Sequence, residues 1–338
     1  MKAIIVDKDY GSVSLDKLQK LQEDYATIGI DCEMAHLSGE DEIIERSMDV
    51  QAILGTGNPP ITRKVIEALP KLRIIQRFGI GVNTVDLDAA AERGVVVMNM
   101  PNFCVEELAT HAASMILALS RNTAYYDRHI RRGEWPKAKY YEPRNLNAQT
   151  LGLYGFGGSA RPLYRILHHG FGTKVIACDP YVPQEIAAQY EVEFVDFDAL
   201  IERSDILSIH APLNNETHHI FNAEVFRRMK NDAMIINIAR GGLINERDLI
   251  NALNIGDIRF AGLDVFEQEP LPPDSPLLSM DNVILTCHSA FYGDTAQATQ
   301  LMLAFELVKE ALVNESISSR YVANKEVLKN LYGFKLKD

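Results

Sequence analysis

Two series of short strand-type segments alternate with helical segments along this chain, and this alternation restricts the fold more than any other feature. The first series runs from KAIIVD at residues 2–7 to VVVMNM at 95–100, and the second from TLGLY at 150–154 to NVILTCH at 282–288. A strand, a helix and a second strand in succession favour a parallel sheet covered by helices on both faces. The sequence therefore predicts an α/β protein with two doubly wound parallel-sheet domains.

A long helical segment follows the second series, from Thr295 to Val313. No strand series remains to cover it, so we expect it to return to the first domain. This assigns residues 1–101 and 290–338 to one domain and 102–289 to an inserted second domain, with a hinge near 102 and 290. The length of 338 residues and the hydrophobic content of 47% are enough for two cores.

A second long helix is predicted from Glu106 to Asn122. It is apolar on more than one face and contains neither Gly nor Pro. Such a helix is either buried within its own domain or forms the surface of a homodimer. Both interpretations are open.

The formal net charge of −12 repels nucleic acid and anionic lipid, so we expect neither as a partner. A small acidic substrate would then need a local positive group, such as an arginine. The first 30 residues lack a basic region followed by an apolar one, and no apolar run approaches 18 residues, so we expect a cytoplasmic protein without membrane contact.

The cysteines are far apart and form no CxxC pair, which favours buried free thiols over disulfides or a metal site. They are Cys32, Cys104, Cys178 and Cys287.

The segment GFGGSA at residues 155–160 has the features of a dinucleotide-binding loop. It follows the strand-type TLGLY and precedes the helical RPLYRILHH, so the amino end of the helix would face a bound anion. Gly155 permits a tight turn, Gly157 lets the backbone approach a pyrophosphate, and Ala160 takes the helix-packing position. An ordinary strand-to-helix turn is the alternative. The predicted cofactor-binding residues of this loop are Gly155, Gly157, Gly158 and Ser159.

Asp179 lies 24 residues after Gly155 (179 minus 155), at the end of the next strand-type segment. A carboxylate there accepts hydrogen bonds from the ribose hydroxyls of the adenosine and repels a 2′-phosphate, so NAD is favoured over NADP. The alternative is a turn residue before Pro180.

Three polar residues follow strands of the second series: Arg240, Glu269 and His288. Ligands gather beyond the carboxyl ends of strands in such sheets, so the three can converge. The planar guanidinium of Arg240 suits a carboxylate and a carbonyl, His288 suits proton delivery, and Glu269 can orient the imidazole and keep it protonated. Each residue alone is also consistent with a surface, loop or structural role.

The chain resembles the D-isomer-specific 2-hydroxyacid dehydrogenases over nearly its whole length. The resemblance rests on six segments in order: RFGIGVNTVDLDAAAERGVVVMNMPN, LGLYGFGGSA, HAPLNNETHHIFN, INIARGGLINERDLINAL, AGLDVFEQEP and ILTCHSAFY. It implies a Rossmann NAD domain inserted into a flavodoxin-like substrate domain, dimerisation through the NAD domain, and reversible NADH-dependent reduction of a small 2-keto acid to a D-2-hydroxy acid, with hinge closure excluding water.

The resemblance also implies further site residues. Asp264 would hold the nicotinamide carboxamide, and backbone amides of Ile80 and Gly81 would bind the substrate carboxylate. Phe291 and Tyr292 resemble the D-lactate dehydrogenase branch, in which an aromatic residue shapes the substrate pocket; packing at the hinge is the alternative. The residues implied to line the cofactor are Ala211, Pro212, Thr217, Ile238 and Ala239.

Two departures from the family pattern are informative. Cys287 stands where Pro is common before the catalytic His, which places a thiol near the site. Gly158 and Ser159 replace bulkier residues of the glycine loop, and we expect weaker contacts to the pyrophosphate.

A regulatory protein that senses NAD, like the C-terminal-binding-protein corepressors, is an alternative that the same fold and residues allow. Those relatives often place Trp where this chain has Phe291, whereas the sole tryptophan here is Trp135. A phosphoglycerate dehydrogenase with a regulatory appendage is not expected, since 50 residues follow His288 (338 minus 288), and Glu269 stands where a formate dehydrogenase would have Gln.

Overall fold

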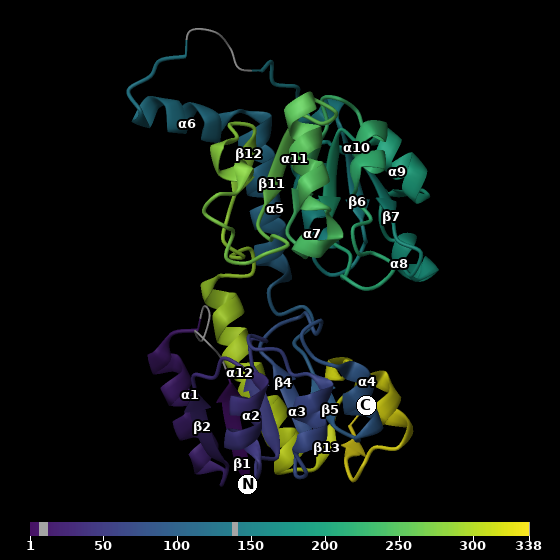
Figure 1. Cartoon of the computed structure of the whole chain (residues 1–338). Helices are drawn as coiled ribbons and strands as arrows, with labels where there is room; N and C mark the ends of the chain where they lie inside the picture. The colour runs from purple at the N-terminus through teal and green to yellow at the C-terminus, as the bar shows by residue number, and fades with distance from the viewer. Residues whose placement is uncertain (7–12, 137–140, 338) are drawn as a thin grey trace. The chain divides into compact units, whose positions relative to one another are not determined.

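The computed structural model describes residues 1–6, 13–136 and 141–337, and the chain divides into two compact units (Figure 1). Unit 1 contains Met1–Phe103 and Tyr292–Asp338, and unit 2 contains Cys104–Phe291. Each unit is built on its own parallel sheet, which confirms the predicted α/β class.

Unit 1 has a five-stranded sheet in the order β2-β1-β3-β4-β5, with every pair parallel. This is the flavodoxin-like order. The strands are β1 (Lys2–Val6), β2 (Asp31–Ala35), β3 (Ala52–Gly55), β4 (Ile74–Arg77) and β5 (Val96–Met98), and the helices between them are α1 (Leu15–Thr27), α2 (Glu40–Ser47), α3 (Arg63–Ala68) and α4 (Leu87–Glu92). Strands β3, β4 and β5 are buried along their whole length, as expected where helices cover both faces.

The last part of the chain belongs to unit 1. Helix α12 (Asp294–Leu312) packs on α1 and β4. The hydroxyl of Tyr25 donates to the carbonyl of Ala304 at 2.8 Å, and the amide of Gln300 donates to the carbonyl of Phe78 at 2.8 Å. Short elements complete the unit: β13 (Ser316–Ile317), β14 (Lys335–Leu336), and 3-10 turns at Ser319–Tyr321 and Lys325–Lys329.

Unit 2 has a seven-stranded parallel sheet in the order β12-β11-β10-β9-β6-β7-β8. Counted from β6, six of these strands have the Rossmann order 3-2-1-4-5-6, and β12 extends it. The strands are β6 (Thr150–Tyr154), β7 (Lys174–Cys178), β8 (Glu193–Phe194), β9 (Ile206–Ile209), β10 (Met234–Asn237), β11 (Phe260–Leu263) and β12 (Val283–Leu285).

The helices of unit 2 are α5 (Val105–Ser120), α6 (Thr123–Arg131), α7 (Ala160–Tyr164), α8 (Gln184–Ala187), α9 (Phe197–Arg203), α10 (Ala223–Arg228) and α11 (Glu246–Ile255). The helix predicted over RPLYRILHH differs from the expectation, because α7 is followed by a π-helical turn at Arg165–His169. The 3-10 turns are Leu146–Ala148, Gly241–Leu243 and Pro276–Ser279.

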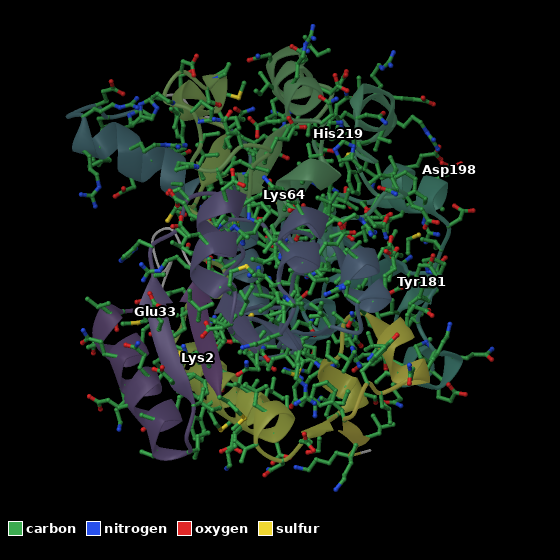
Figure 2. All side chains as sticks on the ribbon, turned by 60° about the horizontal axis from the view of Figure 1, so that its bottom comes forward. Lys2, Glu33, Lys64, Tyr181, Asp198 and His219 are labelled. Atoms are coloured by element: carbon green, nitrogen blue, oxygen red, sulfur yellow. The ribbon has the colours of Figure 1, made fainter. Side chains whose placement is uncertain are left out.

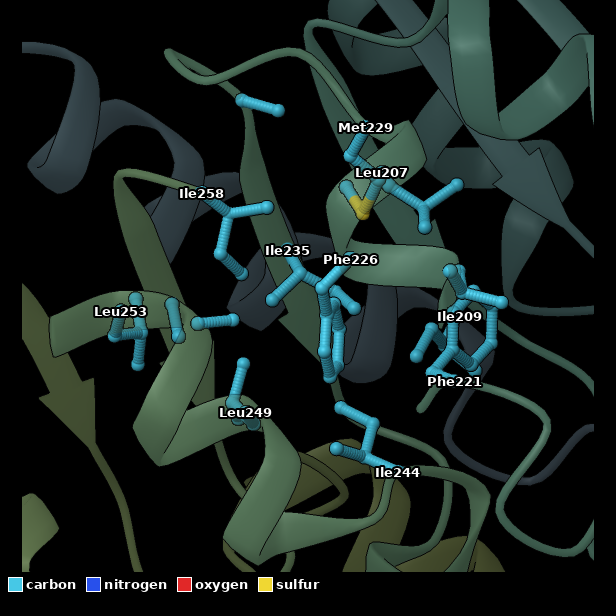
Figure 3. Close-up of a cluster of buried hydrophobic side chains, with 14 of the residues drawn as sticks. Leu207, Ile209, Phe221, Phe226, Met229, Ile235, Ile244, Leu249, Leu253 and Ile258 are labelled. Atoms are coloured by element: carbon cyan, nitrogen blue, oxygen red, sulfur yellow. The ribbon is translucent and has the colours of Figure 1, made fainter. Parts of the chain in front are cut away.

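Alternate residues of the central strands of unit 2 enter two separate cores. Ile235 of β10 packs with residues of α10 and α11, including Phe226 and Leu249, as Figure 3 shows. Its neighbours Met234 and Ile236 join the core that contains α5 and α7. This period of two is the reason that the strand segments of the sequence are apolar throughout.

Helix α5 uses its apolar residues inside unit 2. Its buried positions, among them Ala112, Met115 and Ile116, contact β10, β11 and β12. The intradomain interpretation of this helix therefore accounts for its buried apolar residues, and the dimer interpretation stays a prediction.

Charged side chains such as Lys2, Glu33 and Lys64 stand on the surface, where they form ion pairs with Asp49, Arg46 and Asp41 (Figure 2).

The four cysteines are free, and Cys32 and Cys104 are buried as expected. The expectation of buried thiols is wrong for Cys287, which is exposed, and for Cys178, which is half-buried. Cys287 precedes the loop of His288, and Cys178 ends strand β7. Within the described ranges, no helix has the length and apolar character needed to cross a membrane, and no group of three or more metal-ligand residues could hold an ion.

Candidate active site

The glycine loop of unit 2 lies where the strand order reverses, between β6 and β9. Gly155 has φ +90, which favours glycine. A Cβ at this position would lie 3.0 Å from the backbone nitrogen of Ala211, at the end of β9. The sequence therefore needs glycine here both for the turn and for the close approach of the two strand ends, and the loop occupies the ligand-binding crevice of such sheets.

Asp179 is joined to the glycine loop by a direct hydrogen bond. Its Oδ2 accepts from the backbone N–H of Phe156 at 2.8 Å, and its Oδ1 accepts from the N–H of Tyr181 at 2.9 Å. The residue thus orders the loop and its own turn, and each oxygen keeps a lone pair for a ribose hydroxyl. The exposed Tyr181 beside it is labelled in Figure 2.

The loop itself is shaped to admit a dinucleotide. A Cβ on Gly157 would meet no atom within 4 Å, so the backbone is open on that side. Gly158 and Ser159 are half-buried, and Oγ of Ser159 lies 2.9 Å from Nδ1 of His210. The open backbone and the carboxylate of Asp179 fit the NAD that the sequence predicts.

The other residues predicted to line the cofactor form two loops at the same edge. Ala211 and Pro212 follow β9, and the hydroxyl of Thr217 closes their loop by donating to the carbonyl of Pro212 at 2.8 Å. Ile238 and Ala239 follow β10, where the N–H of Ala239 donates to Oδ1 of Asn237 at 3.1 Å. The structure places all five residues beyond strand ends of unit 2.

His288 and Glu269 form a hydrogen-bonded pair, with 2.7 Å between Nδ1 and Oε2. Their side chains are 41% and 37% exposed, so the pair is open to solvent and substrate. Oε1 of Glu269 accepts from the N–H of Phe266 at 3.0 Å. Burial alone would raise the pKa of Glu269. The net shift is downward, because this effect is outweighed by the hydrogen bond and charge of His288, the Phe266 N–H and the charge of Arg240. Glu269 is therefore a carboxylate at neutral pH.

Arg240 lies close enough to Glu269 for the two charges to influence each other. Burial lowers the pKa of the guanidinium, and Glu269 opposes that effect. Its Nη1 donates to the carbonyl of Ala239 at 2.7 Å. The sequence analysis missed Gly241, where a Cβ would lie 1.9 Å from the carbonyl carbon of Phe266. Only glycine lets the Arg240 turn pack against the loop that carries Glu269.

Asp264 holds the loop that carries His288. It is 1% exposed, and it accepts hydrogen bonds from the N–H groups of Ser289 and Ala290, both at 2.9 Å. Its carbonyl accepts from the N–H of His288 at 2.7 Å. His288 has φ +53, a conformation that costs about 1–3 kcal/mol in a residue with a side chain and persists where the surroundings fix it. The hydrogen bonds to Asp264 fix this conformation of His288. Contact between Asp264 and the nicotinamide carboxamide stays a prediction.

A second residue that sequence reasoning missed is His111, on α5. Its Nε2 lies 3.0 Å from Oγ1 of Thr286, which in turn donates to Oδ1 of Asp264 at 2.5 Å. The signal was a polar residue within an apolar helix, but its partner lies 175 positions away in the chain.

Ile80 and Gly81 belong to unit 1, in a loop that follows β4. The carbonyl of Ile80 accepts from the amide of Asn99 at 2.7 Å, and that of Gly81 accepts from Nε of Arg77 at 3.3 Å. Arg77, which the sequence analysis also missed, is 7% exposed and holds the carbonyl of Gly81, whereas Asn99 holds that of Ile80.

The two aromatic residues after His288 fall in different units. Phe291 ends unit 2, and its ring lies 6.2 Å from that of His288 at an interplanar angle of 81°. Tyr292 begins the second part of unit 1 and is 58% exposed. The structure thus brings Phe291, Arg240, Glu269 and His288 together in unit 2 and assigns Ile80, Gly81 and Tyr292 to unit 1.

Comparisons with known proteins identify the family of the chain. The family model described as "D-isomer specific 2-hydroxyacid dehydrogenase, NAD binding domain" matches residues 113–290. A glyoxylate reductase of Korarchaeum cryptofilum is 37% identical over 80% of this chain and 81% of its own length. A D-3-phosphoglycerate dehydrogenase of Methanocaldococcus jannaschii is 38% identical over 82% of this chain but 52% of its own length.

A solved structure has the same fold: a D-lactate dehydrogenase of Aquifex aeolicus, complexed with NAD and lactic acid, has a TM-score of 0.81 and 25% identity over 92% of this chain and 96% of its own. The chain belongs to the D-isomer-specific 2-hydroxyacid dehydrogenase family, and unit 2 contains the NAD-binding domain of that family. It spans about half the length of the D-3-phosphoglycerate dehydrogenase relative quoted above.

Proposed function

We propose that this chain catalyses the reversible, NAD-dependent conversion of a small 2-keto acid into the D-2-hydroxy acid. The observation that carries the proposal is the pair of His288 and Glu269, 2.7 Å apart, beside Arg240 in the NAD-binding unit. An acid, a residue that orients it and a cation for the substrate are the groups that such a reduction requires. Relatives named glyoxylate reductase, D-lactate dehydrogenase and D-3-phosphoglycerate dehydrogenase support the substrate class.

The proton that the reduced carbonyl needs comes from His288. A bound nicotinamide would supply the hydride, and negative charge would then develop on the carbonyl oxygen of the substrate. Nδ1 of His288 is taken by Glu269, so Nε2 is the ring nitrogen that can transfer a proton. The carboxylate of Glu269 favours the protonated ring in reduction and holds it in place for the reverse reaction.

Arg240 holds the substrate. Its guanidinium presents several N–H groups in one plane, which match a carboxylate and can also polarise the neighbouring carbonyl. The amides of Ile80 and Gly81 are the proposed second set of donors to the carboxylate, on the loop that Arg77 and Asn99 order.

The replacement of His288 by Asn separates binding from chemistry. We expect turnover of 2-keto acids with NADH to fall at least about a hundredfold, since general acid catalysis contributes 10² or more. NADH affinity, measured by fluorescence titration, stays within about twofold, because the glycine loop and Asp179 are unchanged. A panel of pyruvate, hydroxypyruvate, branched and aromatic 2-keto acids identifies the substrate. Equal losses of binding and turnover would contradict the role of His288.

A homodimer through unit 2 is part of the proposal. Helix α6 has no buried residue, and the hydrophobic Ile130 and Trp135 on and after it are 48% and 81% exposed. This surface supports contact with a second copy, and sedimentation equilibrium of the wild type and of Trp135→Glu tests it. A monomeric wild type at micromolar concentration would contradict the dimer.

A further inference from the structure

Three side chains form a hydrogen-bonded chain that joins the glycine loop to β9. Nδ1 of His210 lies 2.9 Å from Oγ of Ser159, and Nε2 lies 2.9 Å from Oγ of Ser208. Ser159 is the residue before α7, at the end of the glycine loop, and it is half-buried. Ser208 is a fully buried residue of β9. The imidazole thus connects a buried hydroxyl with one at the cofactor site.

The backbone of His210 is fixed against the same loop. Its N–H donates to the carbonyl of Tyr154 at 2.8 Å. A Cβ on Gly155 would lie 3.0 Å from the carbonyl carbon of His210, so the two backbones are nearly in contact. The ring therefore has a defined position relative to the loop.

The direction of these hydrogen bonds follows from the burial of the Ser208 hydroxyl. Burial lowers the pKa of His210 to about 3, so at neutral pH the ring has one donor and one acceptor nitrogen. Among the residues that the structure describes, the imidazole is the partner of the Ser208 hydroxyl. A buried hydroxyl proton is nearly always donated, so Ser208 donates to Nε2. Nδ1–H then donates to Oγ of Ser159, and the hydroxyl proton of Ser159 is left to point away from His210.

We propose that Ser159 donates a hydrogen bond to the pyrophosphate of the bound dinucleotide, and that His210 and Ser208 are positioning residues that orient its hydroxyl proton. The inference rests on the proposed use of the glycine loop for NAD. The backbone beside Ser159 is open at Gly157, where an added Cβ would meet no atom within 4 Å. This role is the opposite of the expectation that Ser159 weakens contacts to the pyrophosphate, since the smaller side chain contributes a donor of its own.

The test compares two ligands that differ in the pyrophosphate, ADP-ribose and adenosine, by calorimetric titration of the full chain. Hydrogen bonds to charged groups are strong, so Ser159→Ala is expected to weaken ADP-ribose binding about tenfold and leave adenosine binding within about twofold. Ser159→Thr, which keeps the hydroxyl, retains most of the affinity. Ser208→Ala is expected to weaken ADP-ribose binding about threefold, although Ser208 is buried in β9.

Ser204→Ala is the matched control. Ser204 is also fully buried in unit 2, but its hydroxyl donates to the carbonyl of Leu200 at 2.6 Å. The loss of the Ser204 hydroxyl is expected to leave the affinity for ADP-ribose unchanged. Circular dichroism spectra verify that each variant is folded. Ser208→Cys, which is similar in size but has only a weak donor, replaces Ser208→Ala if the latter does not fold.

A second readout reports the hydrogen-bond direction itself. The ¹⁵N chemical shifts of His210 in labelled protein distinguish the two tautomers, and we expect the proton on Nδ1 in the wild type. A proton on Nε2, or unchanged ADP-ribose affinity in Ser159→Ala, would overturn the inference while the proposed function stands. Failure of the wild type to bind either ADP-ribose or NADH would overturn both.

Discussion

Replacing Glu269 with Gln is expected to slow the reduction of 2-keto acids by removing the charge that supports His288. The substitution keeps the shape of the side chain and removes the charge that lies 2.7 Å from Nδ1. Glu269 accepts hydrogen bonds at both oxygens, from His288 and from the N–H of Phe266. An amide has one acceptor oxygen. If that oxygen faces His288, the NH₂ group meets the N–H of Phe266; if it faces Phe266, the NH₂ group suits only a neutral ring with its proton on Nε2.

The size of the effect follows from the exposure of the pair. Two unit charges about 4 Å apart attract by about 1 kcal/mol in water and about 4 kcal/mol near a protein surface. Because His288 and Glu269 are 41% and 37% exposed, solvent screening places the pair toward the lower value. We therefore expect a loss of about 1.4 kcal/mol, which is about tenfold in rate.

The assay is kcat/KM for reduction of a 2-keto acid at saturating NADH and neutral pH. His288 delivers its proton to the forming alkoxide, and Glu269→Gln removes the charge that favours the protonated ring. We expect the variant to be about tenfold slower. Glu267→Gln is the matched control, since Oε1 of Glu267 lies 2.6 Å from His219 instead. Equal kcat/KM for wild type and Glu269→Gln would refute the reasoning.

Four further outcomes are expected. Arg240→Lys raises KM for the keto acid strongly with some loss of kcat, because a point charge replaces a planar fork; unchanged kinetics would remove Arg240 from the site. Asp179→Ser shifts the NADPH/NADH preference at least about tenfold toward NADPH, and an unaltered ratio would count against the ribose role. Phe226→Ala, in a fully buried position, costs about 3–5 kcal/mol in urea unfolding, and a loss below about 1 kcal/mol would contradict its packing role. In the folded protein His210 stays neutral down to a pKa of about 3, whereas in the unfolded chain its imidazole takes up a proton below the ordinary pKa of 6.5. Lowering the pH from 7 to 5 therefore favours the unfolded state, and the wild type is expected to lose about 2 kcal/mol more stability than His210→Asn. Equal losses would contradict this.

The sequence predicts those parts of the fold that depend on local pattern. Most strands of both sheets are recognisable because they are short apolar runs, and the glycine loop is recognisable because it stands between a strand and a helix. The two-residue strand β8 and the π-helical turn at Arg165–His169 escape prediction, since both are short and have no periodic signal. The exposure of Cys287 depends on the loop it precedes, which composition does not specify.

Within the site, Arg240, Glu269 and His288 are predictable because each follows an apolar strand. The residues that position these three side chains are not predictable, because their roles depend on contacts between distant segments. Asp264 holds the His288 loop through backbone groups 25 and 26 positions away, and Gly241 is explained only by the backbone of Phe266. No local pattern shows which distant backbone will approach.

Deuteride transfer tests the central claim most directly. The enzyme is incubated with NADH deuterated at C4 and each acid of the panel, and the product is analysed by mass spectrometry and chiral chromatography. The predicted result is a D-2-hydroxy acid carrying deuterium at C2 with the wild type, and at least about a hundredfold less with His288→Asn despite normal NADH binding. Tight NADH binding by the wild type without deuterium in any product, or equal transfer by both proteins, would contradict it.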